Sequence, residues 1–247
     1  MHAFLDLWGV VLDSDRMQRA YGERLADRLS DRFGGDRAGW LRAYDTAWEA
    51  YVRETDSTDW EQRPWAATVD DLDARFVLAL LDAGGARRRP EDPKAYAREL
   101  EFEVMASIDA RFPDARTAVE RLRTGGHRVY VATQASESNA RGSLTGAGLI
   151  SLLDGLFTGT SQDAAKTQER YWSGITASLL VPPTECVIVD DRLDYLRAAA
   201  GVGFAALLLD REGVFEGVPL PTQVRAVLRN LAGLPRAVEL IANGELH

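Results

Sequence analysis

Hydrophobic positions follow two different patterns along this chain. Between residues 15 and 108, apolar side chains recur every three or four positions, which is the period of an amphipathic helix. Four such stripes can be followed, at residues 17–29, 40–52, 69–80 and 96–108. No part of this segment has the short β-branched runs that are typical of a strand. The pattern therefore predicts an all-helical segment over residues 15–110.

The rest of the chain alternates short apolar runs with helical segments. The runs lie at residues 3–8, 127–133, 156–158, 186–190 and 205–209. Asp114 is a typical N-cap residue, and we expect it to cap the helix before the second run. Strands that alternate with helices are typical of a parallel sheet covered on both faces. We therefore expect an α/β fold: a doubly wound, Rossmann-like parallel sheet core, residues 1–14 and 111–247, with an inserted all-helical domain, residues 15–110.

Polar side chains stand where three of the predicted strands end. Asp6 lies near the end of the first apolar run, Thr133 closes the second, and Asp190 closes the run at 186–190. In an open parallel sheet, ligands bind outside the carboxyl ends of the strands. We therefore expect these three side chains to share one site.

Composition narrows the possible chemistry. The net charge of −9 argues against a nucleic acid or an anionic membrane as a partner. One cysteine and three scattered histidines exclude a disulfide within the chain and a Cys/His zinc cluster. The chain has only two lysines, Lys94 and Lys166, so a lysine within a motif is informative.

Targeting signals are not evident in the sequence. Residues 1–13 (MHAFLDLWGVVLD) lack the basic start of a signal peptide, and no stretch has the length and apolar character of a membrane helix. We expect a cytoplasmic protein that acts on a small, anionic molecule and has no nucleic-acid or membrane partner. The sequence does not predict an oligomeric state.

Four segments, in this order along the chain, resemble the four motifs of the haloacid-dehalogenase (HAD) superfamily. LDLWGVVLDSD (5–15) is similar to the first motif, an aspartate after a strand, and Thr133 is similar to the second, a Ser or Thr at a strand end. Lys166, with Tyr171 five residues later, resembles the third motif, and IVDDRLDYLRAAAG (188–201) resembles the acidic fourth. Each motif alone is a weak signal, but four in the right order and at the expected element ends are specific. The resemblance extends over residues 1–210, and the predicted helical segment is similar to the family's four-helix cap.

The resemblance implies a Mg²⁺-dependent hydrolase with Asp6 as the nucleophile. A carboxylate can attack phosphorus and form an aspartyl-phosphate, which divides one difficult step into two. In this arrangement Thr133 would donate a hydrogen bond and Lys166 would place a point charge on the phosphoryl oxygens. The implied Mg²⁺ ligands are Asp6, the backbone carbonyl of Trp8, Asp190, and Asp191 or alternatively Asp194.

Trp8 is a departure from the family's phosphatases. They carry a second aspartate at this position, which protonates the leaving group and then activates water. An indole offers one N–H donor and no acceptor, so it cannot perform this cycle. General acid–base catalysis is typically worth about 10²–10⁴ in rate, and we expect phosphatase turnover to be reduced by that order.

Two alternatives to a phosphatase follow from Trp8. Dehalogenase-type members carry an aromatic residue at this position because a halide leaves without a proton, although they usually lack the full acidic fourth motif. A carbon–halogen hydrolase is therefore one alternative. The other is a ligand-binding relative without catalysis, in which Trp8 plugs the site.

Some candidates also have purely structural interpretations. Thr133 is suited to cap the next helix, and Lys166 to lie on the solvated surface. Among the tryptophans, Trp40 and Trp48 are expected in the core of the helical segment. Trp60 and Trp65 lie in or beside a polar loop, 56–65, and are better placed than these two to face a ligand, but packing alone is the favoured interpretation.

Overall fold

The structure, a computed structural model, describes residues 1–60 and 63–246. Two residues of the loop expected at 56–65, and the final residue of the segment 111–247, lie outside the described residues.

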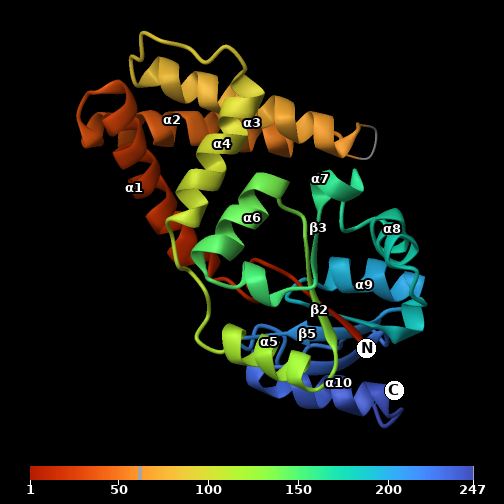
Figure 1. Cartoon of the computed structure of the whole chain (residues 1–247). Helices are drawn as coiled ribbons and strands as arrows, with labels where there is room; N and C mark the ends of the chain where they lie inside the picture. The colour runs from red at the N-terminus through yellow and green to blue at the C-terminus, as the bar shows by residue number, and fades with distance from the viewer. Residues whose placement is uncertain (61–62, 247) are drawn as a thin grey trace.

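A six-stranded parallel sheet forms the centre of the core (Figure 1). Its strands are β1 (His2–Leu5), β2 (Arg128–Thr133), β3 (Gly155–Thr158), β4 (Cys186–Asp190), β5 (Ala205–Leu209) and β6 (Val224–Leu228). They lie in the order β3-β2-β1-β4-β5-β6, and every neighbouring pair is parallel. From β1 the chain adds β2 and then β3 on one side of the sheet. It then returns to the other side of β1 and adds β4, β5 and β6. This reversal beside β1 is the topological switch point at which doubly wound sheets bind ligands.

Helices cover both faces of the sheet. The core helices are α5 (Ala115–Thr124), α6 (Glu137–Gly146), α7 (Gly159–Gln162), α8 (Glu169–Leu179), α9 (Leu193–Val202) and α10 (Leu234–Ala242). Along β1, Ala3 and Leu5 pack with α5 and α10 on one face, whereas Phe4 packs with α8 and α9 on the other. Because both faces are covered, the central strands are continuous apolar runs, as parallel sheets require. The predicted α/β fold class is confirmed.

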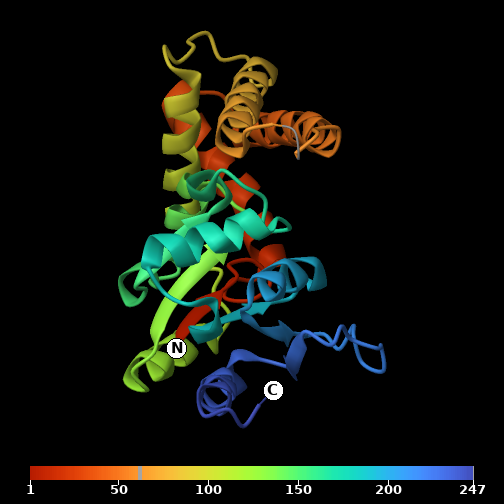
Figure 2. The ribbon, with the colours of Figure 1, turned by 90° about the vertical axis from the view of Figure 1, so that its right-hand side faces the viewer.

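Four helices are inserted between β1 and β2, and we call them the helical insert: α1 (Ser14–Phe33), α2 (Arg37–Asp56), α3 (Trp65–Ala83) and α4 (Pro93–Ala106). They share a hydrophobic cluster of their own and lie at one end of the molecule, above the core (Figures 1 and 2). The side chains of Asp13, Asp36 and Asp92 cap α1, α2 and α4. The insert touches the core mainly where α4 packs on α6 and α3 on α7.

The two connections between the insert and the core run side by side. The Asp13 N–H donates to the Ala110 carbonyl at 2.9 Å, and the Phe112 N–H donates to the Val11 carbonyl at 3.0 Å. An antiparallel bridge joins Leu12 to Arg111 between them. We propose that these two connections divide the chain into the core, 1–14 and 111–247, and the cap, 15–110.

Asp114 does not cap α5 with its side chain, contrary to our expectation. Its carboxylate instead accepts hydrogen bonds from Arg211 at 3.0 and 3.1 Å and from the Leu231 N–H at 2.7 Å. A bidentate guanidinium contact is stronger than a neutral cap bond, so Asp114 links the segments after β5 and β6 to the start of α5.

None of the helices in the described part of the chain has both the length and the apolar character of a membrane span.

Candidate active site

The carboxyl ends of β1, β2 and β4 bring Asp6, Thr133 and Asp190 to one edge of the sheet, as the strand ends predicted. Asp6 directly follows β1, and its N–H donates to the Val189 carbonyl at 2.9 Å, which extends the pairing with β4. All three side chains are buried. The fixed backbone therefore holds the two carboxylates beside each other at the switch point.

Lys166 joins these carboxylates in a buried ion-pair cluster. Its Nζ lies 2.5 Å from Oδ1 of Asp6 and 2.6 Å from Oδ2 of Asp190, and its side chain is fully buried. Burial lowers the pKa of the lysine, but the negative charges of Asp190 and Asp6 outweigh this effect and raise it. The interpretation of Lys166 as a solvated surface lysine is wrong.

Two hydrogen bonds hold the Lys166 backbone in place. Its N–H donates to Oε1 of Gln134 at 2.6 Å, and its carbonyl accepts from the indole of Trp172 at 2.8 Å. Both partners come from the elements next to Lys166, the loop after β2 and helix α8. These two bonds fix the segment between α7 and α8, so that the ammonium group of Lys166 lies beside Asp6 and Asp190.

A third carboxylate, Asp191, completes an acidic group. Asp6, Asp190 and Asp191 each offer an oxygen within 4.8 Å of the others. Burial raises the pKa of Asp190 well above the usual carboxyl value, and burial together with the charge of Asp6 raises that of Asp191. This clustered negative charge suits a small divalent cation that prefers oxygen ligands. Asp194, the alternative ligand, instead forms an ion pair with Arg192 at 2.6 Å.

The loop after Asp6 bends closely over Asp191. Gly9 has a φ of +78°, and a Cβ atom at this position would clash with the Asp191 carboxylate. A glycine is required here both by the backbone conformation and by the close approach.

Thr133 is not the cap of the helix that follows β2. That role belongs to Ser136, whose hydroxyl accepts from the Asn139 N–H at 3.1 Å at the start of α6. The Thr133 hydroxyl accepts only a long bond, 3.3 Å, from the Ala135 N–H. The Tyr171 hydroxyl donates to the Thr133 and Phe157 carbonyls at 3.1 and 2.9 Å, so this tyrosine ties the ends of β2 and β3 together.

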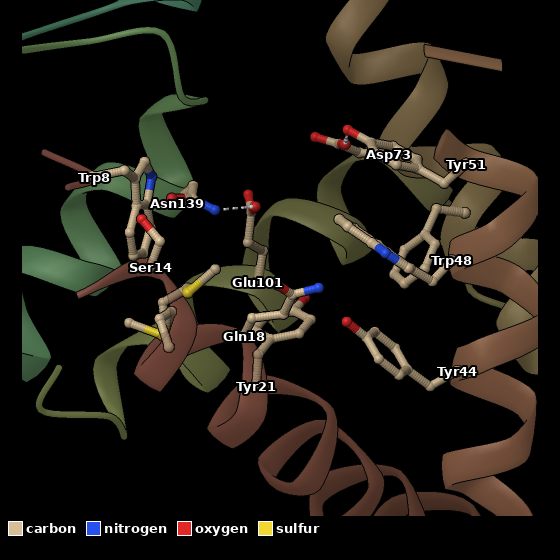
Figure 3. A pocket seen from close by; sticks show the side chains of 13 residues that line it. Trp8, Ser14, Gln18, Tyr21, Tyr44, Trp48, Tyr51, Asp73, Glu101 and Asn139 are labelled. Atoms are coloured by element: carbon tan, nitrogen blue, oxygen red, sulfur yellow. Dashed lines mark hydrogen bonds between the residues drawn. The ribbon is translucent and has the colours of Figure 1, made fainter. Parts of the chain in front are cut away.

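Trp8, two residues after Asp6, forms one wall of a cavity of about 320 Å³ between the core and the helical insert. Figure 3 shows Trp8 and Asn139 on one side of this cavity, and Tyr44, Trp48 and Tyr51 on the opposite side. The indole is partly buried and packs against the hydrophobic clusters of both the core and the insert. The side chain at the family's acid–base position therefore faces the insert.

Of the tryptophans of the insert, Trp48 differs from our expectation. Trp40 is buried in the insert core as predicted, but Trp48 is 36% exposed and lines the cavity. Trp60 and Trp65 pack on each other, with ring centroids 4.2 Å apart, and Trp65 is buried beside Ala165. The helical period shows which face of α2 is apolar but not which part of that face meets another helix.

Sequence patterns did not point to Glu101, which joins α4 to the start of α6. Its carboxylate accepts hydrogen bonds from the hydroxyls of Ser136 and Ser138 at 2.8 and 2.6 Å, and from the side-chain amide of Asn139 at 2.9 Å. Short polar residues at the start of a helix, such as those that begin α6, indicate that an anionic group binds there. The sequence does not show which carboxylate of the chain is that group.

Comparisons with known proteins identify the family of this chain. A family model described as "Hydrolase: haloacid dehalogenase-like hydrolase" matches residues 1–203. The phosphatase MT3486 of Mycobacterium tuberculosis (strain CDC 1551 / Oshkosh) is 32% identical over 188 residues, which are 72% of this chain and 86% of that protein.

Solved structures show the same fold. A HAD phosphatase from Thermococcus onnurineus is 20% identical, with a TM-score of 0.62 over 96% of this chain and 97% of that one. A 2-haloacid dehalogenase from Pseudomonas syringae pv. Tomato is also 20% identical, with a TM-score of 0.68 over 97% and 99%. At this identity the likeness supports the fold alone, whereas the family model covers most of the chain and includes all four motifs. The chain therefore belongs to the haloacid dehalogenase-like hydrolases, and it is a hydrolase of the HAD superfamily.

Proposed function

We propose that this hydrolase is a Mg²⁺-dependent enzyme in which Asp6 attacks the phosphorus of a small phosphate ester. The observation that carries this proposal is the cluster at the switch point, where the buried Lys166 contacts both Asp6 and Asp190 and Asp191 lies nearby. The phosphatase named among the relatives supports the same reaction class. We also propose that the enzyme acts in the cytoplasm.

The donor set fits Mg²⁺. Asp6, Asp190 and Asp191 would hold the ion with carboxylate oxygens, and the backbone carbonyl of Trp8 would be a fourth ligand. When bound, the ion neutralises the negative charge that otherwise keeps a carboxylate and a phosphate apart.

Each residue of the site has a separate role in the reaction. An oxygen of Asp6 forms a bond to phosphorus while the bond to the leaving oxygen breaks, and that oxygen keeps the electron pair and needs a proton. Lys166 and Thr133 stabilise the phosphoryl oxygens by charge and by a hydrogen bond. Water then attacks phosphorus, which releases phosphate and restores Asp6. Trp8 can neither give a proton to the leaving oxygen in the first step nor accept one from the attacking water in the second, so turnover is slow when the leaving group is poor.

The test compares p-nitrophenyl phosphate, whose leaving group departs without a proton, with a simple alkyl phosphate. We expect hydrolysis of the activated ester, little hydrolysis of the alkyl ester, and complete loss of activity in Asp6→Asn. Mass spectrometry of quenched protein should find a phosphate adduct in the wild type and none in Asp6→Asn. Asp194→Asn is the matched control, because this acid of the fourth motif is paired with Arg192 outside the cluster. Full activity of Asp6→Asn would exclude Asp6 as the nucleophile.

One observation favours a second candidate, carbon–halogen hydrolysis. An aromatic residue stands two positions after Asp6 and lines a cavity with mostly apolar walls, which suits a leaving group that needs no proton. Release of halide from 2-haloacids, without hydrolysis of any phosphate ester, would establish this activity in place of the first. If all substrates fail but a ligand binds, the non-catalytic alternative applies.

A further inference from the structure

The cavity between insert and core is walled by aromatic rings. Five of them come from three helices of the insert: Tyr21, Tyr44, Trp48, Tyr51 and Phe76. Neighbouring centroids along α2 lie 6.1 Å apart for Tyr44 and Trp48 and 5.5 Å apart for Trp48 and Tyr51. Phe76 stands edge-on to Tyr51 at 5.6 Å, and Tyr21 is tilted against Tyr44 at 6.0 Å. The five rings therefore form one contiguous series, and Figure 3 shows three of them, Tyr44, Trp48 and Tyr51, on the side of the cavity opposite Trp8 and Asn139.

Two carboxyl groups share this cavity with the rings. Asp73, from α3, accepts a hydrogen bond from the Tyr51 hydroxyl at 3.1 Å, and Glu101, from α4, is held by the start of α6. Burial, together with the negative charge of Glu101, raises the pKa of Asp73 well above its usual value. Among the lining residues that the structure describes, none is a lysine or an arginine. Arg98, the arginine of α4, lies close enough to lower the pKa of Asp73 somewhat, but it does not line this cavity and is paired with Asp70 at 2.9 Å.

An uncharged apolar ligand would account for the aromatic rings of this cavity but not for its two carboxyl groups. Asp73 and Glu101 are both partly buried, and where both are ionised their partial removal from water and their mutual repulsion cost free energy. A cation in the cavity relieves that cost. It is also attracted to the faces of tryptophan and tyrosine rings, which is how proteins recognise ammonium groups.

We propose that this cavity binds an ammonium group, primary or quaternary, and that the substrate of the enzyme is a phosphate monoester whose alcohol carries such a group. The second half of this statement rests on the proposed phosphatase function. Trp8 connects the two sites, because it follows Asp6 by two residues and also lines the cavity. One molecule can therefore place its phosphate at Asp6 and its cation among the rings.

Binding is tested first without phosphate. Isothermal titration with choline, ethanolamine and 3,3-dimethylbutan-1-ol separates charge from shape, because the last compound is the neutral analogue of choline. We expect choline or ethanolamine to bind about tenfold or more tightly than the neutral analogue. Equal binding of the neutral analogue, or no binding of either cation, would overturn the proposal.

Variants then assign the binding to this cavity. Asp73→Asn keeps the shape of the side chain, and Trp48→Leu removes a partly exposed ring; each should weaken cation binding by about tenfold. Asp71→Asn is the matched control, because Asp71 lies on the same helix but is exposed and paired with Lys94. Circular dichroism verifies that each variant is folded. Binding that is unchanged in both cavity variants, or weakened equally in Asp71→Asn, contradicts the assignment.

Catalysis separates this inference from the proposed function. Phosphocholine and phosphoethanolamine are alkyl esters, so we expect slow turnover, but with a lower KM than for 3,3-dimethylbutyl phosphate. Asp73→Asn should bring the KM values for the cationic and the neutral ester closer together. Hydrolysis of p-nitrophenyl phosphate without any preference for the cationic esters would refute the cation inference alone. Choline binding without hydrolysis of any phosphate ester would refute the phosphatase proposal and the phosphate half of the inference, and it would leave the cation site standing.

Discussion

Trp8 decides how the carboxylate chemistry of Asp6 can be completed. The two residues are separated by one position, in a loop whose shape depends on the positive φ of Gly9. An aspartate there could donate and then accept a proton, whereas the indole can only donate a hydrogen bond.

Trp8→Asp should therefore raise the turnover of unactivated alkyl phosphates by about 10²–10⁴-fold. The gain for p-nitrophenyl phosphate should be smaller, because its leaving group needs no proton. Steady-state kinetics on both esters measure the effect. Trp8→Asn is the control, since it opens the same space and offers polarity without a titratable proton. An equal gain in both variants would mean that removal of the indole, and not proton transfer, limits the wild type.

We expect the thiol of Cys186, at the start of β4, to be unreactive in the folded protein. Its side chain is fully buried, and burial raises the pKa of the thiol to about 12, so almost no thiolate exists at pH 8. We expect no alkylation by iodoacetamide in native buffer and complete alkylation in guanidinium chloride, followed by mass spectrometry. Alkylation of the native protein at the rate of the unfolded chain would contradict the burial of β4.

At the scale of elements, the contact between α4 and α6 depends on two glycines. A Cβ atom at Gly142 would lie 2.7 Å from the Cβ of Met105, and a Cβ atom at Gly146 would lie even closer to the carbonyl oxygen of Ile108. The absence of side chains lets the two helices come close enough for Glu101 to reach Ser136, Ser138 and Asn139. This contact positions the insert, and with it the aromatic rings, on the core.

Gly142→Ala should lower the free energy of unfolding by about 1–3 kcal/mol, because the added methyl group overpacks a helix contact that is already closed. Denaturant titration provides the measurement. Gly174→Ala, in the helix α8, is the control: its methyl group would meet only the flexible end of Gln162, and the better helix propensity of alanine should leave it neutral or stabilised by up to about 1 kcal/mol. Equal stability of the two variants would show that α4 and α6 are not in tight contact.

At the scale of the whole molecule, the buried charges of Asp6, Asp190 and Lys166 couple the stability of the fold to Mg²⁺ binding. Lys166 is the only basic side chain in contact with Asp6 and Asp190 among the ion pairs of the described residues. Without it, two carboxylates would face each other out of water, and breaking a buried pair in this way typically costs about 3–5 kcal/mol.

Lys166→Met should therefore lower the melting temperature strongly, and Mg²⁺ should restore part of the loss, because ligand binding to the folded state stabilises by about 2.7 kcal/mol at 100 times the dissociation constant. Thermal melts with and without Mg²⁺ test this. Lys94→Met removes the other lysine, which is exposed and paired with Asp71, and should change stability by no more than about 0.5 kcal/mol. In Asp190→Asn the stabilisation by Mg²⁺ should be lost, and an undiminished shift there would exclude Asp190 as a ligand.

Much of this architecture follows from local properties of the sequence. Helical periodicity identified the segment that became α1 to α4, because a helix of this kind must bury one stripe of side chains wherever it packs. Apolar runs identified β1, β2, β4 and β5, since strands buried on both faces tolerate few polar residues. β6 and α10 were not predicted: β6 is an edge strand with half-exposed, alternating positions that include Arg225, so its pattern resembles that of a surface segment.

Asp6, Thr133 and Asp190 could be named from the sequence because the ends of parallel strands meet at one edge whatever the details of packing. Whether Lys166 is buried, and whether Asp191 or Asp194 faces Asp6, depends on turns and ion pairs between segments far apart in the chain. The same is true of Trp48, Asp73 and Glu101, whose helices show an apolar face but not the neighbour that meets it. Local sequence thus determined the elements and the order of the motifs, whereas only tertiary packing decided which side chains enclose the cavity, because that enclosure exists between elements and not within any one of them.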